Sequence, residues 1–113
     1  MTYQVRFTRV GKTTLTLLQR YMTQYLGADE ARQLVKSLIA ISVEQLEIQP
    51  FQYPICPELD ILGVSDYRQI THQAYKILFR VDETNATVFV MAFLRQRQSA
   101  QQALIDYVLK QEG

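Results

Sequence analysis

The stretch that most constrains the fold is residues 87–94, which read TVFVMAFL. Residues 88–94 are all apolar, so a strand formed here carries apolar side chains on both faces. Such a strand must be covered on both sides, which is typical of a strand in the interior of a sheet. The run is also far shorter than the roughly 20 residues that span a bilayer. We therefore expect a central strand here and no contact of the chain with a membrane.

Strand and helix patterns surround this stretch. Period-2 alternation predicts strands at 3–8, 67–71 and 75–81, and turn-forming residues at 82–86 predict a hairpin between the third strand and the apolar one. Helical spacing of apolar residues from Leu15 stops at Gly27, and Asp29 with Glu30 favours the first turn of a second helix. All three prolines fall within 48–66, which predicts an irregular connection there.

The resulting order is β-α-α-β-β-β-α. Ser99, with Gln102 three residues later, forms a capping box for the final helix. We expect an α+β fold with two N-terminal helices packed on a mainly antiparallel sheet, plus a C-terminal helix. With 113 residues, of which 48% are hydrophobic, the chain is predicted to be one domain over 1–113 with a single core.

Composition narrows the possible chemistry. The single cysteine, Cys56, excludes an intramolecular disulfide and fits a reducing compartment, and the N-terminus lacks an apolar signal core, so we expect a cytoplasmic protein. One cysteine and one histidine, His72, are too few ligands for a structural metal, and no cofactor is predicted. Whether the chain is an enzyme stays open at this point.

The run Gly11-Lys12-Thr13-Thr14 invites comparison with a phosphate-binding loop. That loop needs an earlier glycine for its backbone amides to wrap the phosphates, and Arg6 occupies the position here. The favoured interpretation is a turn between strand and helix in which Lys12 is solvated.

Charge is unevenly distributed although the net charge is only +1. Between residues 67 and 105 the only acids are in the predicted turn, and a sheet face with these cations could bind phosphates or acidic side chains of a partner. The alternative is that they are ordinary solvated strand residues. The candidate target-binding residues are Arg68, Lys76, Arg80, Arg95 and Arg97.

These residues lie in segments that resemble a known family. The runs YRQI at 67–70, YKILFRVD at 75–82 and VFVMAFLRQRQ at 88–98 are similar to the C-terminal half of RelE/ParE toxins. The resemblance covers about forty residues in short, hydrophobic motifs, and the order of elements agrees over the rest of the chain. It implies the toxin of a type II toxin–antitoxin, or plasmid stabilisation, system.

The resemblance also implies the partners. A toxin of this family is neutralised by direct binding of an antitoxin, and the complex can bind operator DNA through the antitoxin. For this chain the antitoxin contacts are expected among Phe89, Met91 and Phe93, because they lie on the strand that is apolar on both faces. RelE-like members cut ribosome-bound messenger RNA with basic and tyrosine residues, whereas ParE-like members inhibit DNA gyrase.

Departures from the family pattern favour the ParE-like branch. Lys76 replaces the usual arginine, and an ammonium cannot make the bidentate contact of a guanidinium with phosphate. Arg95 stands where ParE-like sequences commonly have histidine, and residues 100–103 lack the tyrosine typical of RelE-like nucleases, with Tyr107 the nearest phenol. Gyrase is therefore the predicted target. A ribosome-dependent mRNA endoribonuclease and a non-toxic binding module are the alternatives.

Overall fold

A computed structural model describes residues 2–109 and confirms the predicted α+β order, with one short helix added. The elements are β1 (Gln4–Phe7), α1 (Arg9–Leu26), α2 (Ala28–Ile48), α3 (Pro57–Asp60), β2 (Arg68–His72), β3 (Tyr75–Asp82), β4 (Thr87–Arg95) and α4 (Ala100–Ala103). A 3-10 turn at Pro50–Gln52 and α3 lie within the segment predicted to be irregular, and a π-helical stretch, Leu104–Leu109, continues α4. No helix in the described part of the chain is long and apolar enough to cross a membrane.

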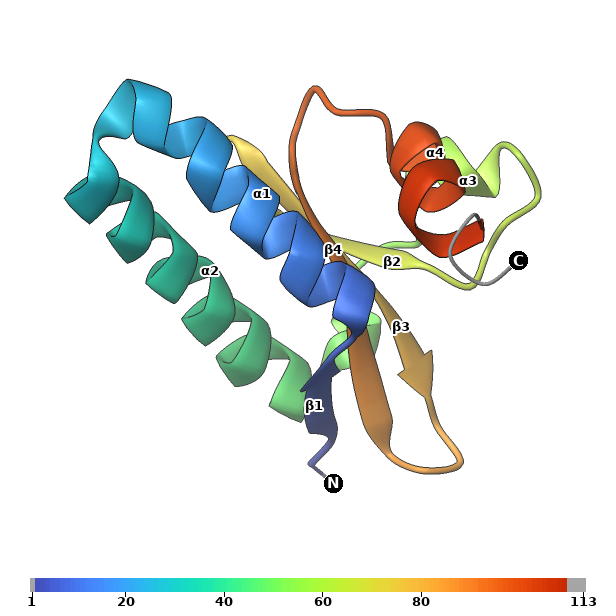
Figure 1. Ribbon diagram of the computed structural model, residues 1–113. Helices are drawn as coiled ribbons and strands as arrows, with labels where there is room; N and C mark the ends of the chain where they lie inside the picture. Colours follow the sequence, from blue (N-terminus) through green and yellow to red (C-terminus); the bar gives the residue numbers. More distant parts are fainter. Residues whose placement is uncertain (1, 110–113) are drawn as a thin grey trace.

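The four strands form one sheet in the order β1-β4-β3-β2 (Figure 1). β1 runs parallel to β4, and the other neighbouring pairs are antiparallel. The predicted interior position of β4 is thus confirmed, since β4 has β1 on one side and β3 on the other.

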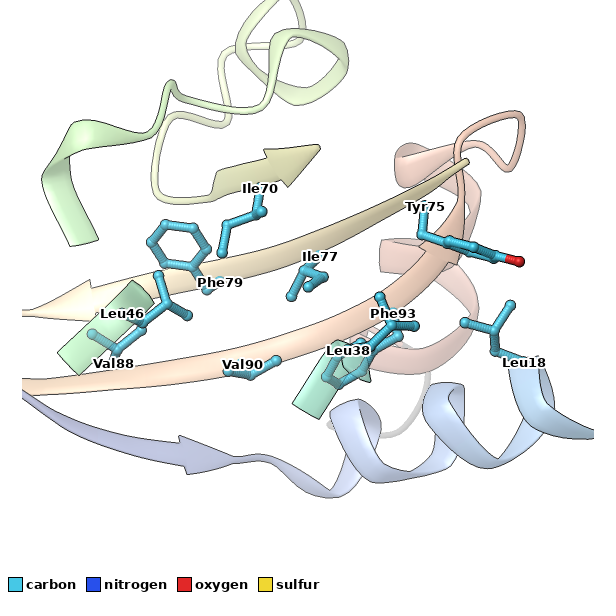
Figure 2. Close-up of a cluster of buried hydrophobic side chains, with 10 residues drawn as sticks. All are labelled: Leu18, Leu38, Leu46, Ile70, Tyr75, Ile77, Phe79, Val88, Val90 and Phe93. Atoms are coloured by element: carbon cyan, nitrogen blue, oxygen red, sulfur yellow. The ribbon is translucent and has the colours of Figure 1, made fainter. Parts of the chain in front are cut away.

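Helices cover both faces of the sheet and explain why β4 is apolar throughout. α1 and α2 form an antiparallel hairpin over one face, where the larger core cluster includes Val88 and Val90 (Figure 2). α3 and α4 pack on the opposite face, against a smaller cluster that includes Ala92 and Leu94. We call these the hairpin face and the α4 face.

A β-bulge changes the direction of side chains halfway along β4. Leu78 of β3 pairs with Ala92, but the next residue, Phe79, pairs with Val90, so Met91 is the extra residue. Phe93 therefore points to the hairpin face, where its ring stacks on Phe7 at 6.0 Å between centroids.

α1 begins earlier than the apolar spacing predicted. The hydroxyl of Thr8 accepts a hydrogen bond from the N–H of Gly11 at 3.0 Å and caps the helix, so residues 11–14 are helical. The interpretation of this run as a turn is wrong, although Lys12 is exposed as expected. The role of Gly11 is packing, because a Cβ atom there would lie 2.5 Å from the carbonyl oxygen of Val90.

The backbone of β4 beyond Val90 depends on α1. β1 ends at Phe7, so β4 continues past its parallel neighbour. The buried hydroxyl of Thr14 accepts a hydrogen bond from the N–H of Phe93 at 3.0 Å and donates one to the carbonyl of Gly11 at 3.0 Å. α1 thus satisfies a buried backbone donor that would otherwise need another strand.

Replacing Gly11 with alanine tests this close contact. Helix propensity alone predicts that Gly11→Ala stabilises the domain by roughly 0.5–1 kcal/mol. Because the new methyl group meets the Val90 carbonyl, we expect destabilisation by about 1–3 kcal/mol instead. Urea denaturation of the isolated chain measures the difference, with Thr16→Ala at an exposed position of α1 as control. A more stable Gly11→Ala variant would contradict the packing role.

Candidate functional site

Lys76 is buried and joins three elements on the α4 face. Its side chain is 3% exposed, and its ammonium forms an ion pair with Glu58 of α3. The ammonium also donates to the carbonyl oxygen of Gln96 at 3.1 Å, and the second oxygen of Glu58 accepts from the N–H of Ala100 at 2.9 Å. Glu58 thus ties the start of α4 to β3, and Lys76 is not a solvated strand residue.

The hydrogen bonds at Glu58 outweigh the effect of its burial. Burial by itself raises the pKa of the carboxyl group, but the bonds from Lys76 and Ala100 stabilise the carboxylate. The pKa of Glu58 therefore lies below its ordinary value. The carboxylate stays charged, and we assign it to structure because both of its oxygens are already used.

Arg68 and Arg80 both contact aromatic rings but on opposite faces. Arg68, in register with Phe79, donates to the carbonyl of Tyr53 at 2.6 Å and lies 5.1 Å from the ring centroid of Phe51. Arg80 alternates with Phe79 along β3 and therefore lies on the α4 face, where its guanidinium is 4.6 Å from the ring centroid of Phe89. Arg80 is partly exposed.

Arg95 and Arg97 lie at the far end of β4. The guanidinium of Arg95 is 4.0 Å from the ring centroid of Tyr21 on α1 and donates to the Tyr21 hydroxyl at 3.2 Å. Arg97 follows in the turn after β4 and is exposed. Both border a hollow of about 220 Å³ with Met22 and Tyr75. Among the five candidate cations, Arg95 and Arg97 border the same hollow.

The expectation of one cationic sheet face is wrong. Arg68 and Arg95 lie toward the helical hairpin, whereas Lys76 and Arg80 lie on the α4 face. Successive residues of a strand alternate between the two faces of the sheet. The bulge lies between Arg80 and Arg95, so the sequence spacing of these two residues does not tell which face each occupies.

The three residues expected to contact an antitoxin are also separated. Phe89 and Met91 are partly exposed, and Met91 borders a small apolar hollow beside α4. Phe93 is 1% exposed within the core, although it also lines a hollow beside α1. The bulge at Met91 is the reason for the split.

Other reactive groups are scattered. Cys56 is buried, and burial raises the pKa of its thiol, so it is an unreactive core residue. His72 lies at the end of β2, near a different hollow from that of Arg95. The described residues contain no group of three or more side chains that could hold a metal ion.

The surroundings of Arg95 suit binding more than proton transfer. The hydroxyl of Tyr25 donates to that of Tyr21, and this hydrogen bond raises the pKa of Tyr25, which stays protonated at neutral pH. Neither His72 nor a carboxylate lines the hollows beside Arg95. The side chain of Tyr107 lies outside the described residues. The described groups can hold an anion or a polar partner, but they do not form an acid–base pair.

Sequence reasoning missed Glu58, Thr14 and Tyr21. Glu58 belongs to a short helix within a segment predicted to be irregular, and no local pattern relates it to Lys76. Tyr21 is 74 positions from Arg95 in sequence, so only the fold reveals the pair.

Comparison with solved structures identifies proteins that share this fold. The chromosomal ParDE toxin–antitoxin system of P. aeruginosa aligns with a TM-score of 0.66 at 18% identity, covering 83% of this chain and 96% of that one. The RelBE2 toxin–antitoxin complex of Mycobacterium tuberculosis gives 0.63 at 18% identity, with coverages of 84% and 99%. A mutant of the E. coli toxin RelE in the free state gives 0.51 at 19% identity, with coverages of 97% and 98%. The chain therefore shares its fold with these three structures.

The particular family follows from the sequence match. The family model described as the ParE toxin of the type II toxin–antitoxin system parDE matches residues 5–100. The chain therefore belongs to the ParE toxin family. No curated protein sequence in the comparison matches the chain.

The ion pair between Lys76 and Glu58 predicts a specific dependence of stability on pH. Because the pKa of Glu58 is lowered on folding, its contribution is present above the ordinary value of 4.5 and is lost as the pH falls through the lowered pKa. We expect Glu58→Gln to have a lower free energy of unfolding than wild type at pH 7. This difference in free energy should disappear as the pH falls below about 4.5. Lys76→Ala should cost roughly 1–3 kcal/mol at pH 7.

Chemical denaturation from pH 3 to pH 8 measures both effects. Glu44→Gln removes one exposed carboxylate of α2 and Lys36→Ala one exposed ammonium of α2, which makes them matched controls. The difference in free energy of unfolding between wild type and Glu58→Gln could instead stay constant across this pH range. That result would show that the carboxylate does not stabilise the fold.

Proposed function

We propose that this protein is the toxin of a type II toxin–antitoxin system that acts in the cytoplasm and inhibits DNA gyrase without cutting RNA. Membership of the ParE toxin family supports the toxin assignment. A fold shared with RelE does not define the target, because related folds carry different activities.

The observation that carries the proposal is how the cations are used. Lys76 is held by Glu58, and the guanidinium groups of Arg68 and Arg95 are engaged by a carbonyl and a phenol. A nuclease needs a proton-transfer pair around an accessible phosphate, together with cations that stabilise the charge of the transition state. The described part of the chain lacks that arrangement, whereas a protein that binds its target needs only an accessible surface.

An antitoxin partner is part of the proposal. Two of the similar structures are toxin–antitoxin systems, and one chain of each shares this fold. We expect nanomolar or tighter binding across an interface of roughly 1,500 Å² or more. The complex would bind operator DNA through the antitoxin, and the pair would serve plasmid stabilisation.

A ribosome-dependent endoribonuclease is the second candidate. Arg95 and Arg97 beside an open hollow, with the phenols of Tyr21 and Tyr75 nearby, are the observation that favours it. These residue types resemble the basic and tyrosine set that RelE-like members use. The two candidates predict different damage in the cell, so one induction experiment separates them.

Inducing the protein in growing bacteria tests the target. We expect filamentation and a DNA-damage response, and the purified protein should inhibit supercoiling by gyrase or trap its cleaved complex. Primer extension on ribosome-bound transcripts from the same cells should show no new 5′ ends within codons. Discrete ends that disappear in Arg97→Ala would reverse the assignment and identify a nuclease. A protein without effect on growth would support the binding-module alternative.

Two of the predicted contacts remain candidates for target binding. Arg80 and Arg97 are at least partly exposed, and neither forms an ion pair within the described part of the chain. We expect Arg80→Ala and Arg97→Ala to reduce toxicity while changing stability by no more than about 0.5 kcal/mol. Lys36→Ala on α2 controls for loss of a surface charge. Growth after induction, together with thermal denaturation, gives the result, and fully toxic variants would exclude these residues from the target surface.

A further inference from the structure

Three residues form a row across the part of the sheet nearest the β3–β4 turn. Arg80 of β3 and Arg6 of β1 are both in register with Phe89 of β4, one on each side of it. Residues paired in this way on neighbouring strands point to the same face, so all three side chains lie on the α4 face. We call Arg6, Phe89 and Arg80 the arginine row.

The bulge at Met91 is the reason that the ring of Phe89 lies on this face. Phe89 and Phe93 are four positions apart, so a regular strand would place both rings on the same side of the sheet. The extra residue separates them: Phe93 packs in the core under the helical hairpin, and Phe89 is partly exposed on the α4 face. The larger core cluster therefore closes without Phe89, which is left to support a neighbouring side chain.

The helices on the α4 face pack toward the other end of the strands. α3 and α4 lie against Leu78, Ala92 and Leu94, away from the β3–β4 turn (Figure 1). Arg6 is exposed, and Arg80 is partly exposed. A partner can therefore reach both guanidinium groups.

Phe89 holds the guanidinium of Arg80 in one orientation. The guanidinium lies over the ring, 4.6 Å from its centroid. Stacking on a ring leaves the N–H groups at the edge of the guanidinium plane free to donate hydrogen bonds. A side chain that is ordered beforehand also loses less conformational entropy when a partner binds. Arg80 is thus prepared to bind a carboxylate through two parallel hydrogen bonds.

The positive charge of the arginine row is left without an ion pair. Neither Arg6 nor Arg80 forms one with any of the described residues. Asp82, two residues after Arg80 on the same face, attracts it, but the two oxygens of Asp82 accept hydrogen bonds from Asn85 in the turn, at 3.2 and 2.8 Å. A further exposed cation, Arg9, follows β1 closely. The surface therefore complements a negatively charged partner.

The spacing and the ring favour an acidic protein over a nucleic acid. Neighbouring strands lie about 4.8 Å apart, so the backbones that carry Arg6 and Arg80 are roughly 10 Å apart, a span that suits two carboxylates of one acidic segment. A single nucleic-acid strand binds by stacking its bases on open aromatic rings, but Arg80 already covers the ring of Phe89. A duplex is held by many phosphate contacts, and the whole chain carries only +1.

We propose that the arginine row binds an acidic segment of gyrase, the proposed target. Each guanidinium pairs with one carboxylate, and Phe89 positions Arg80 for its partner. The proposal rests on the proposed function and extends it by naming the surface and the chemistry of the segment that it binds. It adds Arg6, which is not among the five cations that the sequence suggested.

Charge reversal within the arginine row tests the proposal. Purified gyrase is titrated with full-length wild type, Arg6→Glu, Arg80→Glu and the control Lys36→Glu, and the concentration that halves supercoiling is measured. Lys36 is exposed on α2, which covers the other face of the sheet, so its substitution makes the same change of charge away from the row. We expect Arg6→Glu and Arg80→Glu to raise this concentration about tenfold or more, and Lys36→Glu to leave it within about twofold.

A substitution of Phe89 tests its positioning role. Phe89→Leu keeps an apolar side chain on β4 but removes the ring beneath Arg80, and we expect it to raise the half-inhibiting concentration roughly two- to fivefold. Because Phe89 acts through Arg80, adding Phe89→Leu to Arg80→Glu should cause no further loss. Circular dichroism verifies that each variant folds. If Arg6→Glu does not fold, Arg6→Ala is measured with the same direction of effect expected.

The outcomes distinguish the arginine row from the function. Wild type that inhibits gyrase, with Arg6→Glu and Arg80→Glu equally potent, would overturn the arginine row and leave the proposed function intact. Wild type that leaves gyrase unaffected would overturn both. A gel-shift assay with duplex DNA in the absence of gyrase covers the other class of partner. Duplex binding that Arg6→Glu abolishes, with the calorimetric affinity for gyrase unchanged, would assign the row to nucleic acid and overturn the proposal.

Discussion

The close contact between α1 and β4 is the interaction on which the rest of the domain depends. β1 pairs with only the first part of β4, and α1 then takes over along the remainder. Gly11 allows the helix backbone to approach Val90, and the hydroxyl of Thr14 satisfies the N–H of Phe93. This contact places the middle of α1 beside the end of β4, which brings Tyr21 to Arg95.

The opposite face of the sheet is closed by a different kind of interaction. The apolar cluster on this face is the smaller of the two, and α3 and α4 are each four residues long, although the π-helical stretch Leu104–Leu109 continues α4. Glu58 compensates by joining Lys76 of β3 to the N–H of Ala100 at the start of α4. The Lys76 side chain is 3% exposed but that of Glu58 is 41% exposed, so the ion pair is a weak source of net stability, whereas removal of Glu58 leaves the buried ammonium without its main contact. We interpret Glu58 as the group that fixes where α4 begins.

The distribution of cations connects the fold to the proposed function. Five cations lie in β2, β3, β4 and the turn after β4, yet three of these side chains, Arg68, Lys76 and Arg95, are engaged inside the domain. Lys76 stabilises α4, Arg68 holds the chain near Tyr53, and Arg95 stacks on Tyr21. The proposed function is compatible with this use of the cations, since binding a protein target requires shape and charge but no proton transfer.

The sequence by itself determined the order of elements, the interior position of β4 and the hairpin that precedes β4. It also determined the capping of the last helix by Ser99, whose hydroxyl accepts a hydrogen bond from the N–H of Gln102. These follow from local patterns: the apolar run, the turn residues and the capping spacing. It predicted poorly where α1 begins, because the Thr8 cap and the packing of Gly11 depend on β4.

Only the tertiary structure decided which candidate residues belong together. The bulge at Met91 buries Phe93, and the short α3 brings Glu58 to Lys76 across 18 positions. Period-2 alternation assumes a regular strand. A single extra residue therefore moves every later side chain of the strand to the opposite face of the sheet. Contacts between distant segments, such as Tyr21 with Arg95, depend on how the helices cross the sheet, and no local pattern in the sequence encodes that geometry.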